Sequence, residues 1–305
     1  MILVAGLTPA WQQIAVLDRL RVGEVNRARE VHWCASGKVL NVGLALTQLG
    51  ANVRTLSLVG SGAAGEATRR DMADLGADVR WIESSARQRV CTTLLDREPG
   101  QTTEIVENSA AATSAELAAF EAAFAEEAAS HAFDFVVLTG SLPIGTPSEF
   151  YSRLLDHTRA KAILDVRGPE LLATWRHTPF LVKPNREELA HTVQRSLLTD
   201  DDAWQAMREI HEFGAEWVVV TDGPQRVLAS NEGQRRQNAD RFWFDVPQVE
   251  VVNPIGCGDC FTAGLAWALQ RGEEMPTAIR TGIAAAAQNA EQLLPARLDA
   301  KLLQT

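Results

Sequence analysis

The sequence predicts an α/β protein in which a mostly parallel sheet carries helices on both faces. Short runs rich in apolar and β-branched residues alternate nearly throughout the 305 residues with segments whose apolar residues recur at helical spacing. Strict alternation of strands and helices is typical of a parallel sheet covered on both faces. No repeat, low-complexity segment or linker stands out, so we expect a single domain over residues 1–305.

Strands and helices are predicted in alternating order along the chain. The predicted strands are residues 2–7, 54–59, 133–138, 161–164, 180–182 and 217–221, all rich in aliphatic or aromatic side chains. The predicted helices are residues 41–49, 66–75, 114–130, 147–158, 186–193 and 203–213, where apolar residues recur three or four positions apart. A last helix has an apolar stripe that begins with Phe261 and Leu265, and it is expected to stop before Gly272.

Two segments, about residues 12–33 and 88–106, interrupt this alternation. Both have alternating or turn-rich patterns without a convincing helix, and residues 88–106 are typical of a hairpin that turns at Glu98-Pro99-Gly100-Gln101. Two interpretations remain open. The segments are either ordinary peripheral strands or a small sheet that projects from the main body as a lid or pairing surface.

Composition excludes several classes of partner. The net charge of -10 argues against nucleic acid or an anionic membrane as the main partner. No apolar run approaches the roughly 20 residues of a membrane-spanning helix. The first seven residues lack a basic segment and are predicted as a strand rather than a signal peptide, so we expect a cytoplasmic protein.

The 4 cysteines are too few for a disulfide scaffold. Cys257 and Cys260 have the spacing of a redox or zinc pair, but the chain has no second such pair. A dithiol role stays open, because a helix N-terminus lowers the pKa of a thiol. Small side chains that fill tight positions are the favoured interpretation.

Polar and glycine residues follow the ends of four predicted strands. These residues are Thr139-Gly140-Ser141, Asp165-Val166-Arg167-Gly168, Lys183-Pro184-Asn185 and Thr221-Asp222-Gly223. In open α/β sheets, ligands bind outside the carboxyl ends of the strands. We therefore expect a ligand-binding cleft at this edge of the sheet.

The run Gly256-Cys257-Gly258-Asp259 directly precedes or opens the last predicted helix. Free backbone N–H groups and the helix dipole favour an anion there, and glycines let the backbone approach a phosphate. This pattern predicts a loop that stabilises a phosphoryl group in transfer, with Asp259 receiving the proton of the acceptor hydroxyl. The alternative is structural, a tight turn followed by an acidic residue that interacts favourably with the helix dipole.

A second glycine run predicts a different chemistry. Residues 60–65 form G-x-G-x-x-G between a predicted strand and a predicted helix, and Glu83 follows about 20 residues later, as in nicotinamide-binding units. An oxidoreductase is therefore an alternative hypothesis. Against it, the pattern lies some way into the chain, and Glu83 lies beyond the expected strand end. This hypothesis also leaves Asp259 and the polar strand ends without a role.

Together these residues resemble the ribokinase family of carbohydrate kinases, and in particular its bacterial 6-phosphofructokinase-B branch. The resemblance rests on a series of motifs in family order: residues 36–42, Leu49-Gly50, Gly60 and Gly65, Thr139-Gly140-Ser141-Leu142-Pro143, Lys183-Pro184-Asn185 with Glu188-Leu189, Thr221 with Gly223, and residues 253–261. It implies a ribokinase-like three-layer sandwich with a mostly parallel central sheet and a small β lid.

The resemblance also implies a role for each matching residue, with ATP and Mg²⁺ as cofactors. Asp259 would be the base, and the amides of Gly256, Cys257 and Gly258 would form an anion hole. Lys183, Asn185 and Glu188 would organise Mg²⁺ and the nucleotide phosphates, while Thr221, Gly223 and Asn289 would line the nucleotide pocket. Gly37, Lys38 and Asn41 would hold the sugar under the lid, which in this family often pairs between subunits, so a homodimer is expected.

For Asn185 and Glu188, a helix cap and a surface acid are the structural alternative. A helix N-terminus should lower the pKa of Asp259.

The acceptor is predicted by comparison with the nearest subgroup, the 1-phosphofructokinases and tagatose-6-phosphate kinases. This sequence departs from the motifs of that subgroup at several positions. Gln12 stands where that subgroup has a sugar-binding Asp, and Val39 replaces a glycine beside the sugar. The lid motif keeps Arg89 but loses its Asn and Lys. Lys38 and Arg89 are expected to bind a substrate phosphate, which favours a sugar phosphate of the fructose 1-phosphate, fructose 6-phosphate or tagatose 6-phosphate type. An unphosphorylated sugar or nucleoside is the alternative acceptor, and a non-catalytic sugar-binding protein is the alternative class.

Overall fold

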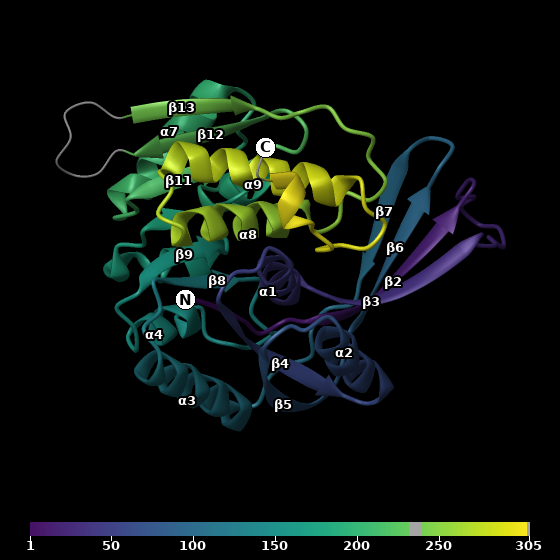
Figure 1. The fold of residues 1–305 in the computed structure, drawn as a ribbon, viewed down its shortest axis with the longest axis horizontal. Coiled ribbons are helices and arrows are strands. Elements are labelled where there is room, and N and C mark those ends of the chain that lie inside the picture. Colours follow the sequence, from purple (N-terminus) through teal and green to yellow (C-terminus); the bar gives the residue numbers. More distant parts are fainter. Residues whose placement is uncertain (232–239, 304–305) are drawn as a thin grey trace.

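A central sheet of nine strands runs through the middle of the molecule. The computed structural model describes residues 1–231 and 240–303, and in this part the strand order is β13-β12-β11-β10-β9-β8-β1-β4-β5 (Figure 1). The strands are β1 Ile2–Gly6, β4 Val53–Ser61, β5 Val79–Arg87, β8 Phe135–Thr139, β9 Lys161–Asp165, β10 Leu181–Val182, β11 Trp217–Val220, β12 Arg226–Asn231 and β13 Asp240–Asp245. Seven strands from β11 to β5 pair in parallel, and β12 and β13 are added antiparallel. The predicted mostly parallel sheet is confirmed.

Helices cover both faces of this sheet because alternate residues of each strand point to opposite sides. In β1, Ile2 and Val4 pack with one set of helices, whereas Leu3 and Ala5 pack in a separate core. The first face carries α1 Lys38–Gln48, α2 Ala63–Asp74, α8 Cys257–Gln270 and α9 Met275–Ala290. The second face carries α3 Ser114–Ser130, α4 Phe150–Leu155, α5 Gly168–Leu172, α6 Arg186–Thr192 and α7 Asp200–Glu212, and short 3₁₀ turns lie at Trp175–His177 and Ala300–Leu303. The three-layer arrangement is therefore confirmed.

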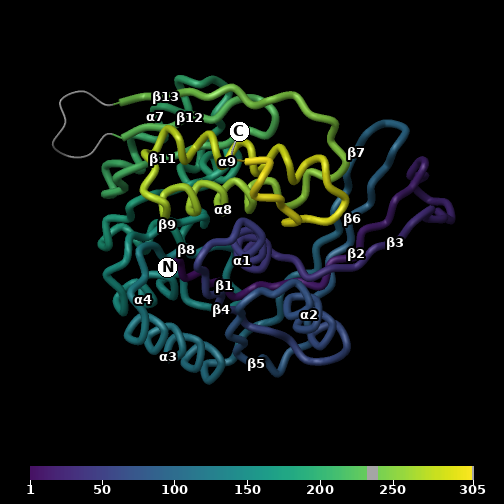
Figure 2. The backbone as a smooth tube through the Cα atoms, viewed as in Figure 1, coloured from purple at the N-terminus to yellow at the C-terminus, as the bar shows by residue number. Residues whose placement is uncertain are grey.

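A second, smaller sheet projects to one side of the main body (Figures 1 and 2). Its strands are β2 Ala10–Leu17, β3 Glu30–Ser36, β6 Val90–Asp96 and β7 Gln101–Val106, in the order β3-β2-β6-β7. The strands come from the two irregular segments, although β2 starts earlier and β3 ends later than expected. The predicted small sheet is confirmed, and its role as a lid stays a prediction.

Several elements were not expected from the sequence. Strands β5, β12 and β13 and helix α9 had no counterpart among the predicted elements, and α4 is much shorter than the helix predicted at 147–158. Close packing of α9 on α8 depends on small residues: a Cβ at Gly264 would lie 2.8 Å from the Ala285 Cβ, and one at Gly282 would lie 2.8 Å from the Phe261 carbonyl oxygen. Within the described ranges, no helix is both long and apolar enough to cross a membrane.

The glycine run at 60–65 has a packing role in the structure. A Cβ at Gly65 would lie 1.8 Å from the Gly60 carbonyl oxygen, so this position admits only glycine. The expectation that Glu83 lies beyond a strand is wrong, because Glu83 pairs with Val59 inside β5. Its carboxylate forms an ion pair with Arg69 of α2.

Candidate active site

A cavity of about 830 Å³ opens at the carboxyl ends of the parallel strands. Fourteen of the fifteen predicted site residues line it: Gln12, Gly37, Lys38, Asn41, Arg89, Lys183, Asn185, Glu188, Thr221, Gly223, Gly256, Cys257, Gly258 and Asp259. They come from the ends of β10 and β11, the first turns of α1, α6 and α8, and the small sheet. Parallel strands bring these segments together because their carboxyl ends meet at one edge of the sheet.

Asn289 is the exception, because the structure places it behind α8 with no exposed surface. The expectation that it lines the nucleotide pocket is wrong. Its Nδ2 donates to the Ile255 carbonyl at 2.9 Å, and its Oδ1 accepts from the Ala296 amide at 2.8 Å. Asn289 therefore fixes the loop that leads into α8. Both Cys257 and Cys260 also contact it, and burial raises the pKa of both thiols.

The N-terminus of α8 forms one wall of the cavity. Gly256 has φ +85°, a left-handed conformation, and a Cβ there would lie 2.9 Å from the Pro295 Cβ. The Cys257 amide donates to the Pro254 carbonyl at 3.3 Å, within a turn. In the described structure no backbone acceptor is found for the Gly258 amide, which leaves it able to bind an anion.

Asp259 lies in the first turn of α8 and is 6% exposed. Its Oδ2 accepts a hydrogen bond of 2.7 Å from the Asn41 Nδ2 of α1. Burial raises the pKa of Asp259 to about 7, although Lys38, Lys183 and the Asn41 hydrogen bond act to lower it. The expectation that the helix N-terminus lowers this pKa is wrong, because desolvation of the carboxylate outweighs the favourable charges.

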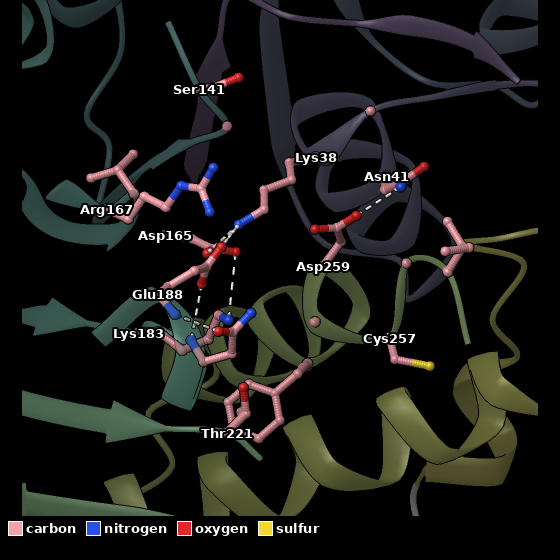
Figure 3. A pocket seen from close by; sticks show the side chains of 18 of the residues that line it. Lys38, Asn41, Ser141, Asp165, Arg167, Lys183, Glu188, Thr221, Cys257 and Asp259 are labelled. Atoms are coloured by element: carbon pink, nitrogen blue, oxygen red, sulfur yellow. Dashed lines mark hydrogen bonds and ion pairs between the residues drawn. The ribbon is translucent and has the colours of Figure 1, made fainter. Parts of the chain in front are cut away.

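Two lysines and two carboxylates form an ion cluster beside Asp259 (Figure 3). The Lys38 Nζ lies 3.0 Å from Asp165 and 2.8 Å from Glu188. The Lys183 Nζ lies 3.6 Å from the other oxygen of Asp165. Burial acts to raise the pKa of Asp165, but Lys183 and Lys38 prevail and lower it, so Asp165 is an anion that holds both lysines in place.

Asp165 is a site residue to which sequence reasoning gave no role. The only signal was its position at the end of a strand, in a run of polar residues. A buried acid shared by two lysines that are distant in sequence becomes visible only in three dimensions. The Thr262 hydroxyl of α8 also lies 3.3 Å from Asp165, so this carboxylate ties α8 to the strand ends.

Asn185 and Glu188 form a reciprocal cap at the start of α6. The Asn185 Oδ1 accepts from the Glu188 amide at 2.7 Å, and the Glu188 Oε2 accepts from the Asn185 amide at 2.9 Å. The helix-cap part of the structural alternative is thus confirmed, but Glu188 is not a surface acid, because its side chain is only 12% exposed. The second oxygen of Glu188 faces Lys38 in the cavity, so the cap also presents a carboxylate to a ligand.

The two ends of the cavity differ in character. At the end beside Thr221 and Gly223, apolar side chains form a wall suited to a flat ring: Val227, Val246, Ile283 and Ala286. Two of these belong to α9, which the sequence did not predict. At the other end the wall comes from the small sheet and the loop before α1, and it mixes polar side chains with the apolar Ala10 and Val106.

Polar groups at this second end are largely engaged with the protein. The Arg89 guanidinium donates to the carbonyls of Thr8 at 2.6 Å and Pro9 at 3.0 Å. The Gln12 Nε2 donates to the Thr93 hydroxyl at 2.6 Å. Glu104 faces the same space, and its pKa is raised mainly by burial. Gly37, with φ +94°, is held where a Cβ would lie 2.9 Å from the Thr8 carbonyl oxygen.

Comparisons with known proteins agree on one family. A model of the pfkB family of carbohydrate kinases matches residues 1–298. The structure of phosphofructokinase-2 from Escherichia coli in complex with substrates and products is 25% identical, with TM-score 0.88, covering 99% of this chain and 97% of that chain. A possible 1-phosphofructokinase from Thermotoga maritima is 18% identical, with TM-score 0.87 and coverage of 99% and 96%. Ribokinase from the same organism is 19% identical, with TM-score 0.76 and coverage of 99% and 98%, which confirms the predicted ribokinase-like fold.

Proposed function

The chain belongs to the pfkB family of carbohydrate kinases, and on this basis we propose that it transfers the γ-phosphoryl group of ATP to a hydroxyl of a sugar phosphate. The acceptor would be of the fructose 1-phosphate, fructose 6-phosphate or tagatose 6-phosphate type. The observation that carries the proposal is Asp259, a buried carboxylate with a pKa of about 7 beside the free amide of Gly258. The oxidoreductase hypothesis is wrong, because the family consists of kinases and the glycines at 60–65 serve packing.

Asp259 would act on the acceptor hydroxyl. A pKa near 7 leaves the carboxylate ionised in part of the molecules at neutral pH while making it a competent proton acceptor. As the hydroxyl oxygen bonds to the γ-phosphorus, the bond from that phosphorus to the β-phosphate oxygen breaks. The hydroxyl proton passes to Asp259, and ADP leaves.

Asn41 would orient the same hydroxyl. Its Nδ2 donates to Asp259, and its Oδ1 is buried without a hydrogen-bond partner among the described residues. A buried acceptor without a partner is costly, and an incoming donor group would satisfy it. A sugar hydroxyl beside the reacting one fits this requirement, which supports the predicted role of Asn41 in holding the sugar.

The transferring phosphoryl group would lie at the N-terminus of α8. Phosphoryl transfer depends mainly on positioning and on neutralising charge, which fixed amides supply with little reorganisation. The Gly258 amide and the Lys183 ammonium lie on the same side of the cavity, since a Cβ at Gly258 would be 3.9 Å from the Lys183 Nζ. We expect the adenine to lie against the apolar wall near Thr221, Gly223 and Ile283.

The donor set suits a magnesium ion held mainly by ligand phosphates and water. In the part of the chain that the structure describes, no group of three or more His, Cys, Asp or Glu could hold a metal ion. Mg²⁺ in phosphoryl-transfer sites usually keeps several waters and takes one or two carboxylates. Glu188, with Asn185 beside it, would hold such an ion, which would neutralise phosphate charge when bound.

Two observations favour the second candidate acceptor, an unphosphorylated sugar or nucleoside. The Arg89 guanidinium donates to backbone carbonyls, and Glu104 on the same wall would repel a phosphate if ionised. The sugar phosphate remains our first proposal because the solved phosphofructokinases are similar over nearly the whole chain. One of these, 25% identical, was solved in complex with fructose 6-phosphate.

We also propose that the small sheet closes the sugar end and pairs with a second subunit to form a homodimer in the cytoplasm. Its exposed surface includes apolar residues, with Trp33 44% and Ile105 59% exposed. Exposed apolar side chains on a projecting sheet suit a pairing surface. Sedimentation of the wild-type protein and of Trp33→Glu tests this: we expect a dimer that dissociates in the variant, and a wild-type monomer would refute the proposal.

Release of ADP with ATP and Mg²⁺ tests the function. The acceptor panel contains the three phosphosugars named above, free sugars and nucleosides, and Asp259→Asn is the control. We expect turnover on one phosphosugar that collapses in the variant. Turnover on free sugars or nucleosides alone would support the second acceptor class. No turnover while ATP still binds would favour the non-catalytic sugar-binding protein.

A further inference from the structure

Among the residues that the structure describes, two lysines and two arginines line the cavity, and three of these four cationic side chains already have partners. The Lys38 and Lys183 ammonium groups are paired with Asp165, and Lys38 is also paired with Glu188. Arg89 donates to backbone carbonyls. The fourth, Arg167, makes no hydrogen bond or ion pair with any residue that the structure describes, although it lies on the cavity wall.

The backbone explains why Arg167 faces the cavity. Strand β9 ends at Asp165, and Arg167 keeps extended dihedral angles, φ −137° and ψ 168°. Residues two apart in an extended chain share a face, so Arg167 follows Asp165 toward the ligand while Val166 packs in the core. Gly168, with φ +59°, then turns the chain into α5. Figure 3 shows the Arg167 guanidinium directed toward the Lys38 side chain.

The charges around this point leave a need for another cation. The Asp165 and Glu188 carboxylates already neutralise the two ammonium groups of Lys38 and Lys183, and Asp259 adds a carboxylate that is ionised in part of the molecules at neutral pH. A nucleotide polyphosphate would add more negative charge to that cluster. An arginine without a partner can bind two phosphate oxygens in parallel without first breaking an ion pair.

The position of β9 in the sheet indicates which phosphate group Arg167 would contact. β9 lies between β8 and β1 on the sugar side and β10 and β11 on the nucleotide side. A side chain at the end of β9 therefore lies at the boundary where a group passes from nucleotide to acceptor. Ser141, labelled on one side of Arg167 in Figure 3, follows β8, and Lys183 follows β10.

We propose that Arg167 is a catalytic residue that binds the γ-phosphoryl group of ATP during its transfer. This inference rests on the proposed kinase function. The guanidinium would bind the oxygens of the transferring group opposite the α8 amides, and would stabilise the charge that develops as the bond to the β-phosphate oxygen breaks. A phosphate on the acceptor sugar has the same chemistry, and the experiment separates the two sources.

Steady-state kinetics of Arg167→Ala and Arg167→Lys test the proposal, with Arg208→Ala as the matched control. Arg208 is an exposed arginine of α7 that does not line the cavity. We expect Arg167→Ala to lower kcat by about 10³-fold with little change in the KM of the acceptor, as for other arginines that act on a transferring phosphoryl group. Low concentrations of guanidinium chloride should restore part of this loss, whereas Arg208→Ala should match the wild type.

The contrary results are distinct. A raised KM for the phosphosugar with unchanged kcat would overturn the proposal and assign Arg167 to the acceptor's own phosphate. Unchanged kinetics, or a loss that guanidinium does not relieve and that Arg167→Lys shares in full, would also overturn it.

Binding measurements keep this inference separate from the proposed function. Calorimetry compares the affinities for MgADP and for a non-hydrolysable MgATP analogue, in the wild type and in Arg167→Ala. We expect the alanine variant to lose about tenfold of the preference for the analogue, because the analogue alone carries the γ-phosphate. If no acceptor is turned over and yet this preference is lost, the proposed function fails and the Arg167 contact stands. A preference that is equal in both proteins overturns the inference.

Discussion

Replacing Asp259 by Asn should make the protein more stable as it becomes inactive, and increasingly so at higher pH. Burial raises the pKa of Asp259 from 3.8 to about 7 in the folded protein. At a pH between these two values, an acid whose pKa is raised on folding takes up a proton as the chain folds. The free energy of unfolding therefore falls by about 1.4 kcal/mol per pH unit across that window, and below pH 3.8 this contribution vanishes.

The expected magnitude follows from this window. Ionised Asp259 costs about 4 kcal/mol of stability above pH 7, the product of the pKa difference and 1.36 kcal/mol per unit. Asn carries no charge, and its Oδ1 can still accept the hydrogen bond from Asn41 Nδ2. Asp259→Asn should thus match the wild type near pH 4 and exceed its melting temperature by roughly 8 °C at pH 8, at about 2 °C per kcal/mol.

Thermal unfolding at pH 5 and pH 8 measures this difference, alongside kcat at each pH. Removing a positioned general base should lower kcat by about 10³-fold. Asp165→Asn is the matched control with the opposite sign, because the pKa of Asp165 is lowered by Lys183 and Lys38. Its loss should destabilise the protein at neutral pH, with the deficit shrinking as the pH falls toward the folded-state pKa. Equal melting temperatures for Asp259→Asn and the wild type at pH 8 would refute the assigned cost of burying this charge.

Two other substitutions test the parts of the site around Asp259. Lys38→Met leaves the Asp165 and Glu188 carboxylates without one cation, so we expect kcat to fall by about 100-fold. Because Lys38 is partly exposed, the free energy of unfolding measured in denaturant titrations should fall by only about 1–2 kcal/mol. An unchanged kcat would show that this lysine is only structural. Gly256→Ala places a Cβ near Pro295 on a residue in the left-handed conformation, so we expect the free energy of unfolding to fall by about 1–2 kcal/mol and kcat to fall as well. A variant that is destabilised but fully active would show that the α8 N-terminus has no part in the mechanism.

The sequence predicts the parts of this protein that depend on local pattern. The strands of the sheet centre are continuous apolar runs, as β1 and β8 show with every residue buried, and such runs are recognisable alone. The glycines at 256 and 258 with Asp259 also identify the α8 loop directly. Polar residues follow the strand ends because the ligand-binding cleft lies at that edge of the sheet.

Features that depend on tertiary contacts were missed. Strand β5 lies at a sheet edge and has no fully buried residue, and α9 is rich in alanine because it packs closely on α8, so neither has a strong hydrophobic pattern. The raised pKa of Asp259 arises from burial, which the local helix dipole does not reveal. The engagement of Arg89 with the carbonyls of Thr8 and Pro9 is likewise a long-range contact.

Phosphorus NMR of the complete reaction tests the central claim most directly. Wild-type protein, MgATP and the acceptor that turns over in the ADP assay are followed until ATP is consumed. We expect ADP and one new phosphomonoester on the acceptor in equal amounts, and both should form about 10³-fold more slowly with Asp259→Asn. ATP converted to ADP and inorganic phosphate without a new ester would contradict transfer to a sugar hydroxyl at Asp259.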